Sequence, residues 1–326
     1  MRGAISKWLA GLMLAAGLTA SAAAQDYPTR PVTLVVPYAA GGGLDQLARL
    51  LQAPLEKRLG KPLVIENRTG GGTVIGAASV AKAPPDGYTL LMATSTPLAI
   101  NVTIHKNLPY DPARDFTPVS IISNAPFVFV VTPSFPARTL AEYFEMARKE
   151  PGKISYTSAG PGSPQHLYSE LMQGMAGIKL THVPYRGDAP ALADLVAGHV
   201  PSGFVEIGTV MPFVAEGKVR PLAISSAVRA AALPNVPTIS EAGAPGFDAV
   251  SWQMVVAPTG TPKAIIDKLH ADYRAVLLSP EIQAEYARTG RIVVDPPPVG
   301  VLSDYLKSEI ARWGKVVQAA GLAGSQ

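Results

Sequence analysis

The sequence predicts an α/β protein with mostly parallel sheets flanked by helices, divided into two domains. Its 326 residues are enough for two domains of ordinary size. Hydrophobic residues make up 48% of the chain and charged residues only 16%, so the chain can bury a large core. Strand-like runs alternate with helical patterns, which is the order that βαβ units produce.

The first 24 residues have the features of a secretory signal peptide. Arg2 and Lys7 precede a short apolar run, and small residues up to Ala24 resemble a cleavage site. We therefore expect residues 1–24 to be removed and the mature protein to be exported. The chain contains no cysteine, so we expect neither a lipoprotein anchor nor a disulfide.

The expected strands and helices follow one another along the chain, with Pro and Gly at many of the boundaries. Strands are expected at residues 32–37, 62–67, 89–94, 118–123, 127–132, 153–158, 221–225, 251–258 and 291–295. Helices are expected at residues 44–59, 73–82, 139–149, 164–176, 189–197, 263–278, 280–289 and 300–320.

Two apolar stretches are candidates for crossings between the domains. Residues 123–134 and 250–262 are strand-like and are flanked by Pro or Gly. The chain after residue 262 is mostly helical and lacks the strands for a domain of its own, so it should complete the first domain. We therefore predict that domain 1 comprises residues 25–124 plus 249–326 and that domain 2 comprises residues 125–248.

Four strand-to-helix turns share a pattern that suits an anion. They are the glycine turn at 38–45, the hydroxyl-rich turn at 94–96, and the turns at 158–163 and 186–188. Ligands of open α/β sheets bind beyond the carboxyl ends of the strands. Free N–H groups and the positive end of the helix dipole lie at the start of each following helix. The turns therefore predict a site for a carboxylate.

Three of these turns contain a residue that can cap the next helix. Thr96, Ser163 and Asp188 each precede a helical pattern with Pro in its first turn, which is typical of an N-cap. The alternative for any single turn is an ordinary structural connection, because turns rich in Gly and Ser are common in α/β proteins.

Motifs for catalysis or cofactor binding are weak or absent in the sequence. The glycines at 69–76 are spaced one residue too far apart for a dinucleotide loop and are interpreted as a turn that packs a helix against the sheet. A Ser163–His166 catalytic pair and a His166–Glu170 metal pair are the alternatives, and neither has a supporting motif. We expect no enzymatic activity, no cofactor and no metal. No basic run suggests nucleic acid.

Several long segments together resemble one family of receptors. They are "YPTRPVTLVVPYAAGGGLDQLARLL", "GKPLVIENRTGGGTVIGAASVAKAPPDGYTLLM", "LPYDPARDFTPVS", "HVPYRGDAPALADLVAGHV", "LPNVPTISEAG" and "SWQMVVAPTGTP". They are similar to the Bug family of extracytoplasmic solute receptors, the TctC-like receptors of tripartite tricarboxylate transporters. The likeness runs from Asp26 to the C-terminus. It implies a two-domain periplasmic binding protein, type II-like, whose domains close like a Venus flytrap about two crossing strands.

The resemblance also implies a function and a set of partners. The protein would be a monomer that captures a small carboxylate and delivers it to the membrane subunits of a tripartite tricarboxylate transporter. One alternative is an orphan receptor that senses a carboxylate or an aromatic acid and signals through a membrane sensor kinase. A hydrolase on the same fold is a further alternative without a nucleophile motif.

The resemblance assigns ligand contacts to the four turns and to neighbouring residues. The predicted ligand-binding residues are Tyr38, Ala40, Gly42, Gly43, Asp45, Thr94, Ser95, Thr96, Ser158, Gly160, Ser163, His166, Arg186, Gly187, Asp188 and Phe204. Two places depart from the family pattern. The stretch at 201–210 is unusual, and an acidic residue stands at Asp188, where it would repel an anion unless Arg186 or an amine on the ligand offsets its charge.

Overall fold

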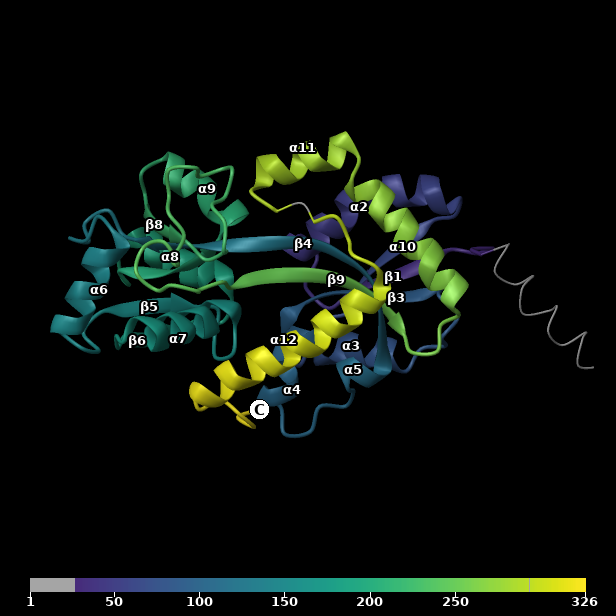
Figure 1. Ribbon diagram of the computed structural model, residues 1–326, viewed down its shortest axis with the longest axis horizontal. Coiled ribbons are helices and arrows are strands. Elements are labelled where there is room, and N and C mark those ends of the chain that lie inside the picture. Colours follow the sequence, from purple (N-terminus) through teal and green to yellow (C-terminus); the bar gives the residue numbers. More distant parts are fainter. Residues whose placement is uncertain (1–26, 293) are drawn as a thin grey trace, which may run out of the picture.

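The computed structural model describes residues 27–292 and 294–326, and its elements form two lobes joined by two long strands (Figure 1). The predicted signal peptide lies outside the described residues. The joining strands are β4 (Phe116–Val131) and β9 (Val250–Pro258). They run side by side from one lobe into the other, as Figure 1 shows.

The first lobe combines the beginning and the end of the described chain. Its elements are β1 (Val32–Val36), α2 (Gly43–Leu59), β2 (Leu63–Asn67), α3 (Val74–Ala81), β3 (Thr89–Thr94), the π-helical turn η1 (Thr96–Ile100), α4 (Asn101–Ile104), α5 (Pro112–Asp115), α10 (Lys263–Leu277), α11 (Pro280–Thr289) and α12 (Val299–Ala319).

The second lobe is formed by the chain between the two joining strands. Its elements are α6 (Leu140–Lys149), β5 (Ser155–Ser158), α7 (Pro164–Ala176), β6 (Thr181–Pro184), α8 (Asp188–Ala197), β7 (Ser202–Glu206), α9 (Ile207–Ala215) and β8 (Arg220–Ile224).

The strands pair in the order β2-β1-β3-β9-β4-β7-β5-β6, with β8 also paired to β4. The expected parallel pairs are present in both lobes, where β1 pairs with β2 and β3, and β5 pairs with β6 and β7. The pairs that involve β4 or β9 are antiparallel, so the sheet as a whole is mixed. The α/β prediction is confirmed.

β4 is one strand where two were predicted. Asn124 and Pro126 interrupt the apolar pattern between 118–123 and 127–132, but the backbone continues through them. Residues 116–126 pair with β9, and residues 127–131 pair with β7 and β8. The strand therefore changes partners where it passes from one lobe to the other.

Other differences from the prediction have local causes. β6, β7 and α9 were not predicted. β7 contains Gly203, where a side chain would collide with Thr157 of β5, and α9 contains Pro212 yet packs Ile207 and Val210 into a hydrophobic cluster with β4. The predicted strand at 291–295 is wrong. Among its described residues only Ile292 forms a bridge, to Asn124.

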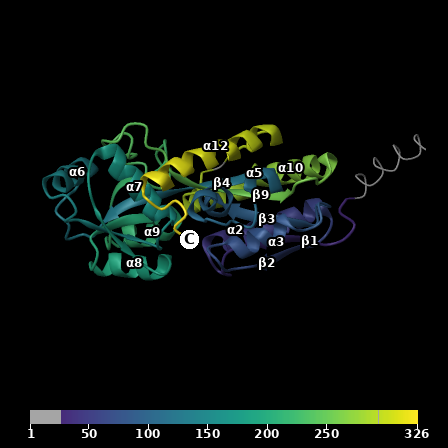
Figure 2. The same ribbon diagram turned by 90° about the horizontal axis from the view of Figure 1, so that it is seen from below.

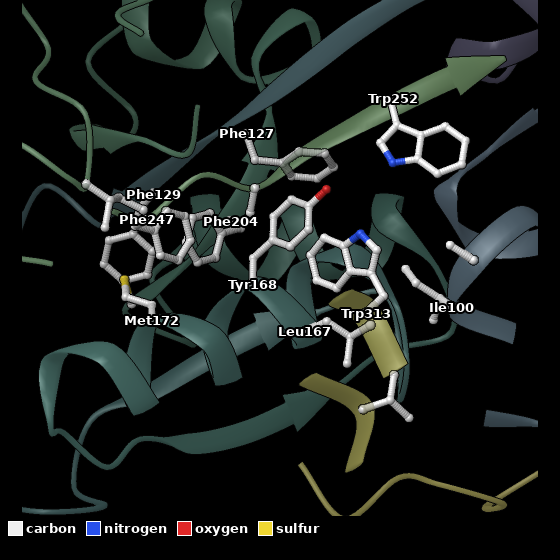
Figure 3. Packing of buried hydrophobic residues seen from close by; sticks show 14 of the residues in the cluster. Ile100, Phe127, Phe129, Leu167, Tyr168, Met172, Phe204, Phe247, Trp252 and Trp313 are labelled. Atoms are coloured by element: carbon white, nitrogen blue, oxygen red, sulfur yellow. The ribbon is translucent and has the colours of Figure 1, made fainter. Parts of the chain in front are cut away.

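The last helix, α12, packs along both lobes on one side of the molecule (Figures 1 and 2). Its Trp313 stacks on Tyr168 of α7, with ring centroids 5.5 Å apart (Figure 3). The buried carboxylate of Glu309 accepts hydrogen bonds from the indole nitrogens of Trp252 (2.7 Å) and Trp313 (3.0 Å). One hydrophobic cluster therefore extends from η1 in the first lobe to Phe129 in the second.

No helix in the described part of the chain has both the length and the hydropathy needed to cross a bilayer.

Gly76, in the glycine-rich segment 69–76, allows α3 to pack closely on the sheet. An added Cβ would lie 2.5 Å from the carbonyl oxygen of Arg68 and 2.8 Å from Cβ of Pro37, because α3 approaches the end of β1 closely at this point. The interpretation of this segment as a turn that packs a helix on the sheet agrees with these contacts.

We expect Gly76→Ala to lower the free energy of unfolding by about 1–3 kcal/mol, because the backbone neighbours must move apart. Gly174 of α7 is the matched control, since an added Cβ there would have no neighbour within 4 Å. Gly174→Ala should stabilise the protein by about 0.5–1 kcal/mol through helix propensity. Urea denaturation measures both values, and equal effects of the two substitutions would contradict the packing role.

Candidate functional site

The glycine turn before α2 is held by a buried carboxylate. Asp45 accepts hydrogen bonds from the backbone nitrogen of Gly41 (2.7 Å), from Nε of Arg49 (2.9 Å) and from Nδ2 of Asn67 (3.0 Å). The bond from Arg49 is the main cause that lowers the pKa of the Asp45 carboxyl. Asp45 is 1% exposed, so it positions the turn and its side chain is not available to a ligand.

The glycines of this turn have different tasks. Gly41 adopts a φ of +81°, which favours glycine, whereas Gly42 is the N-cap of α2 and Gly43 is the first residue of the helix. Gly41, Gly42, Gly43 and Ala40 are all exposed. The start of α2 therefore presents bare backbone at the surface, as an anion site at a helix N-terminus requires.

The second turn of the first lobe is tied to the glycine turn by hydroxyl groups. The Tyr38 hydroxyl lies 2.6 Å from Oγ1 of Thr94, and that same oxygen accepts a hydrogen bond from the backbone nitrogen of Thr96 (3.2 Å). Burial raises the pKa of Tyr38 to about 12, and the charge of Asp188 adds to the shift. Thr96 is not the N-cap that was predicted, because the chain enters the π-helical turn from Ser95 and no side chain caps it.

The two turns of the second lobe pack against each other through their backbones. The nitrogen of Tyr185 donates to the carbonyl of Ser158 (3.0 Å), and the nitrogen of Gly187 donates to Ala159 (3.2 Å). A side chain at Gly160, whose φ is +124°, would come 3.1 Å from the carbonyl oxygen of Tyr185. The neighbouring parallel strands β5 and β6 thus bring these turns together.

Ser163 caps α7 as predicted. Its Oγ accepts from the backbone nitrogen of His166 (3.4 Å), and Pro164 is in the first turn. Because that hydroxyl is bonded to the helix backbone, and Nδ1 of His166 accepts from the nitrogen of Gly162 (3.1 Å), the two side chains do not form a catalytic pair.

His182 contacts the side chains of Ser158 and His166, two other residues predicted to bind the ligand. Its Nε2 lies 2.5 Å from Oγ of Ser158, and its ring stacks on His166 with centroids 3.9 Å apart. Burial is the main cause that lowers the pKa of His182 to about 4 and also lowers that of His166. Oγ of Ser158 is bonded to His182 and to the nitrogen of Gly160, and the ring of His166 is stacked on His182 and bonded to Gly162, so the structure does not support their side chains as ligand contacts.

The structure gives little support to His166 and Glu170 as a pair of metal ligands. Nε2 of His166 lies 3.9 Å from Oε1 of Glu170. Within residues 27–292 and 294–326, no three His, Asp or Glu side chains are grouped as metal ligands.

Asp188 is the first residue of α8 and does not cap it. Gly187 is the N-cap, with a φ of +117°, and the Asp188 carboxylate instead accepts a hydrogen bond from Nε2 of Gln165 in the first turn of α7. The prediction of a cap is wrong because the helix begins one residue earlier than its pattern suggested. Arg186 and Asp188 are both exposed.

Phe204 lies in the core and not at the surface of the site. Its side chain is 2% exposed. The centroid of its ring lies 5.0 Å from that of Phe129 and 5.9 Å from that of Tyr168 (Figure 3). Two positions later on the same face, β7 ends at Glu206, which is partly exposed. The structure therefore does not support Phe204 as a ligand-binding residue.

Glu206 and Arg291 join the second lobe to the glycine turn. Nη2 of Arg291 lies 3.6 Å from Oε1 of Glu206 and donates to the carbonyl of Gly43 at 3.3 Å. An added Cβ on Gly43 would be 3.6 Å from Oε2 of Glu206. Burial raises the pKa of Glu206, Arg291 opposes that shift, and Asp188 adds to it. Residues from both lobes therefore meet at the start of α2.

Four buried polar atoms without a hydrogen-bond partner in the described chain belong to Arg291 or to residues linked to the site, since Asn124 bridges to Ile292, Gln165 bonds to Asp188 and Ser95 lies between Thr94 and Thr96. They are Oγ of Ser95, Oδ1 of Asn124, Oε1 of Gln165 and Nε of Arg291. Three others are in His105, Tyr168 and Tyr273. Native proteins leave few buried polar atoms unpaired, so such a group indicates the place of a polar ligand or water.

Gln165, Glu206 and Arg291 were missed by the sequence reasoning. Glu206 lies in the 201–210 stretch that departs from the family pattern, which was a usable signal. Gln165 follows a capping Ser-Pro pair, and Arg291 lies in a segment interpreted as a strand, so neither carried a signal of its own. A separate cavity of about 550 Å³, lined by residues that include Thr117, Ile266, His270 and Val299, contains none of the predicted residues.

Comparison with known proteins identifies a family over most of the chain. Residues 47–322 match the model of the tripartite tricarboxylate transporter family receptor. Protein BugT of Bordetella pertussis is 36% identical over 313 residues, which cover 95% of this chain and 96% of BugT.

Two solved structures of related proteins contain carboxylates. Rpa4515 of R. palustris, determined with adipate, has a TM-score of 0.81 and 40% identity and covers 91% of this chain and 99% of its own. MatC from Rhodopseudomonas palustris, with bound malate, has a TM-score of 0.77 and 35% identity and covers 89% of this chain and all of its own. The fold prediction of a two-domain periplasmic binding protein agrees with these relatives.

Replacement of Asp45 tests its role in holding the glycine turn. We expect Asp45→Ala to lower the free energy of unfolding at pH 7 by about 1–3 kcal/mol, because buried N–H groups lose their acceptor. The folded pKa of Asp45 is depressed, so this stabilisation is present above the unfolded pKa of about 3.9 and is lost as the pH falls through the folded value. Denaturation at several pH values measures it. Asp304→Ala, at an exposed carboxylate of α12, is the control and should change little.

Gly43 tests whether bare backbone is needed at the start of α2. A Cβ there has ordinary contacts, so Gly43→Ala should be tolerated. Gly43→Val should lower the affinity for a carboxylate ligand at least about tenfold, because its methyl groups press on Glu206 and Arg291. Calorimetry measures the affinity, and circular dichroism verifies folding. An unchanged affinity of the folded Val variant would mean that the turn is only a connection.

Proposed function

The chain belongs to the tripartite tricarboxylate transporter receptor family, and on that premise we propose that it captures a small carboxylate between its lobes in the periplasm. We further propose that it delivers this ligand, as a monomer, to the membrane subunits of such a transporter. The family description is that of a receptor, in agreement with the expectation that the chain is not an enzyme.

One observation carries the proposal. The exposed start of α2, with its unpaired helix N–H groups, lies against Glu206 and Arg291 at the meeting point of the lobes. A carboxylate accepts several hydrogen bonds at once and benefits from the positive end of the helix dipole. The hydroxyls of Ser95 and Thr96 are close to the same turn through the Tyr38–Thr94 contact. We assign the ligand contacts to Gly42, Gly43, Ser95, Thr96, Arg186 and Gly187, with Ala40 and Gly160 as turn residues.

The change of partners along β4 supports the proposed domain division. Domain 1 comprises residues 25–124 plus 249–326, and domain 2 comprises residues 125–248. β4 leaves β9 after Pro126, and β9 begins at Val250. The continuous core beneath α12 links the domains on one side, so we propose that they open on the side of Glu206 and Arg291, with β4 and β9 as the hinge.

The relatives suggest the first ligands to test. Adipate and malate should be screened by thermal shift together with other dicarboxylates of similar length. A ligand at 100 times its dissociation constant adds about 2.7 kcal/mol to the free energy of unfolding, which raises the melting temperature by several degrees. We propose residues 1–24 as the export signal, so the protein used should begin near Gln25.

The acid and its monoamide distinguish carboxylate recognition from nonspecific binding. We expect the monoamide of the best ligand to bind at least about tenfold more weakly, because the amide nitrogen cannot accept a hydrogen bond from the helix N–H groups. Calorimetry measures both affinities. If no acid raises the melting temperature, or if the monoamide binds equally well, the proposed function is wrong.

A further inference from the structure

Beside the donors of Arg186 and Gly187, the second lobe places three acceptor side chains at the proposed ligand site. These side chains are Gln165 at the start of α7, Asp188 at the start of α8 and Glu206 at the end of β7. The first lobe offers mainly donors, namely the start of α2 and the guanidinium of Arg291. The two sides of the site therefore differ in chemistry, although a simple dicarboxylate would have two like ends.

Gln165 has one amide atom bonded and the other unpaired. Its nitrogen donates to Asp188, while its buried oxygen has no partner among the described residues. The side chain is 7% exposed, so this oxygen is not simply hydrated at the surface. A buried amide oxygen is satisfied only by a donor, which must be an N–H or O–H group.

The carboxylate of Asp188 lacks a cationic partner in the described chain. Its carboxylate forms no ion pair with a basic side chain of residues 27–292 and 294–326, and its one hydrogen bond comes from the neutral Gln165. Burial raises the pKa of Glu206 and of Tyr38, and the nearby charge of Asp188 adds to both shifts. Glu206 is paired with Arg291, whose other contact is the carbonyl of Gly43. Arg186 is exposed two residues before Asp188 and forms no ion pair with it.

We propose that Asp188, positioned by Gln165, accepts hydrogen bonds from an ammonium group on the ligand, so that the protein prefers an amino acid to an unsubstituted dicarboxylate. This inference rests on the proposed function and names the ligand class of that same site. The carboxylate of the amino acid lies at the start of α2, and its ammonium group lies between Asp188 and the oxygen of Gln165. An ammonium group supplies donors to both atoms and neutralises the carboxylate of Asp188.

A hydroxyl group is the competing donor. It satisfies the Gln165 oxygen or Asp188 but leaves the charge of Asp188 uncompensated beside Glu206. A hydroxy acid should therefore bind more weakly than the matched amino acid and more tightly than the unsubstituted acid.

Three acids with one carbon skeleton test the inference. Succinate, malate and aspartate differ only by hydrogen, hydroxyl or ammonium on one carbon, and glutarate, 2-hydroxyglutarate and glutamate repeat the series one carbon longer. We expect calorimetry on the mature full chain to show, in at least one series, the amino acid binding about 10- to 100-fold tighter than the unsubstituted acid, as for a hydrogen bond between charged groups.

The measurement that decides is the ratio of the affinity for the amino acid to the affinity for the unsubstituted acid. A merely structural role of Asp188 would leave this ratio unchanged. Asp188→Asn should reduce the preference for the amino acid at least about tenfold while leaving the affinity for the unsubstituted acid equal or higher. Gln165→Leu should reduce the same ratio by a smaller factor, because it leaves Asp188 in place without its orienting bond. Asp304→Asn, at a solvated carboxylate on α12, is the matched control and should leave the ratio unchanged.

The outcomes separate this inference from the proposed function. If unsubstituted or hydroxy acids bind as tightly as the amino acids, or if Asp188→Asn weakens all of them equally, the inference is wrong and the carboxylate receptor stands. If no carboxylate binds the folded protein, with or without an amine, both the proposed function and this inference are overturned.

Discussion

The antiparallel pairing of β4 with β9 joins the lobes, because β4 belongs to the sheets of both. Its first part pairs with β9 beside β3, and its last residues pair with β7 and β8. A strand can pass between two sheets in this way only if its backbone stays extended through Pro126, where it pairs with Val250. The relative position of every turn at the site depends on this crossing.

The two sides of the crossing have different physical characters. On one side α12 covers the strands, and Trp252 and Trp313 share the carboxylate of Glu309 within a continuous hydrophobic core. On the other side polar groups meet, with Glu206, Arg291 and the carbonyl of Gly43 in contact. Exposing apolar surfaces to water is unfavourable, whereas charged groups that separate are hydrated again, which offsets the loss of their contact. Opening on the polar side therefore disturbs the structure least.

Residues that hold a binding turn and residues that offer atoms to a ligand are different sets here. Asp45, Ser158, Ser163 and His166 use their polar atoms on the backbone and side chains of their own turns. The unpaired buried atoms belong instead to residues such as Ser95 and Gln165. Hydrogen-bonding capacity, once committed to a turn, is not available to a ligand, so the type of a residue alone does not show which set it belongs to.

The sequence by itself determined the α/β class, most helices, the Ser163 cap and the location of the four turns, because these depend on local periodicity and on glycine and capping residues. It also marked Asp188 and the stretch around Glu206 as unusual. The tertiary structure alone decided that Phe204 is buried, that Asp188 bonds to Gln165, and that Arg291 reaches Gly43. Those contacts join residues 23 to 248 positions apart in the chain. Only the pairing of β5 with β6 and the packing of the lobes brings such residues together, and no local pattern encodes contacts over such separations.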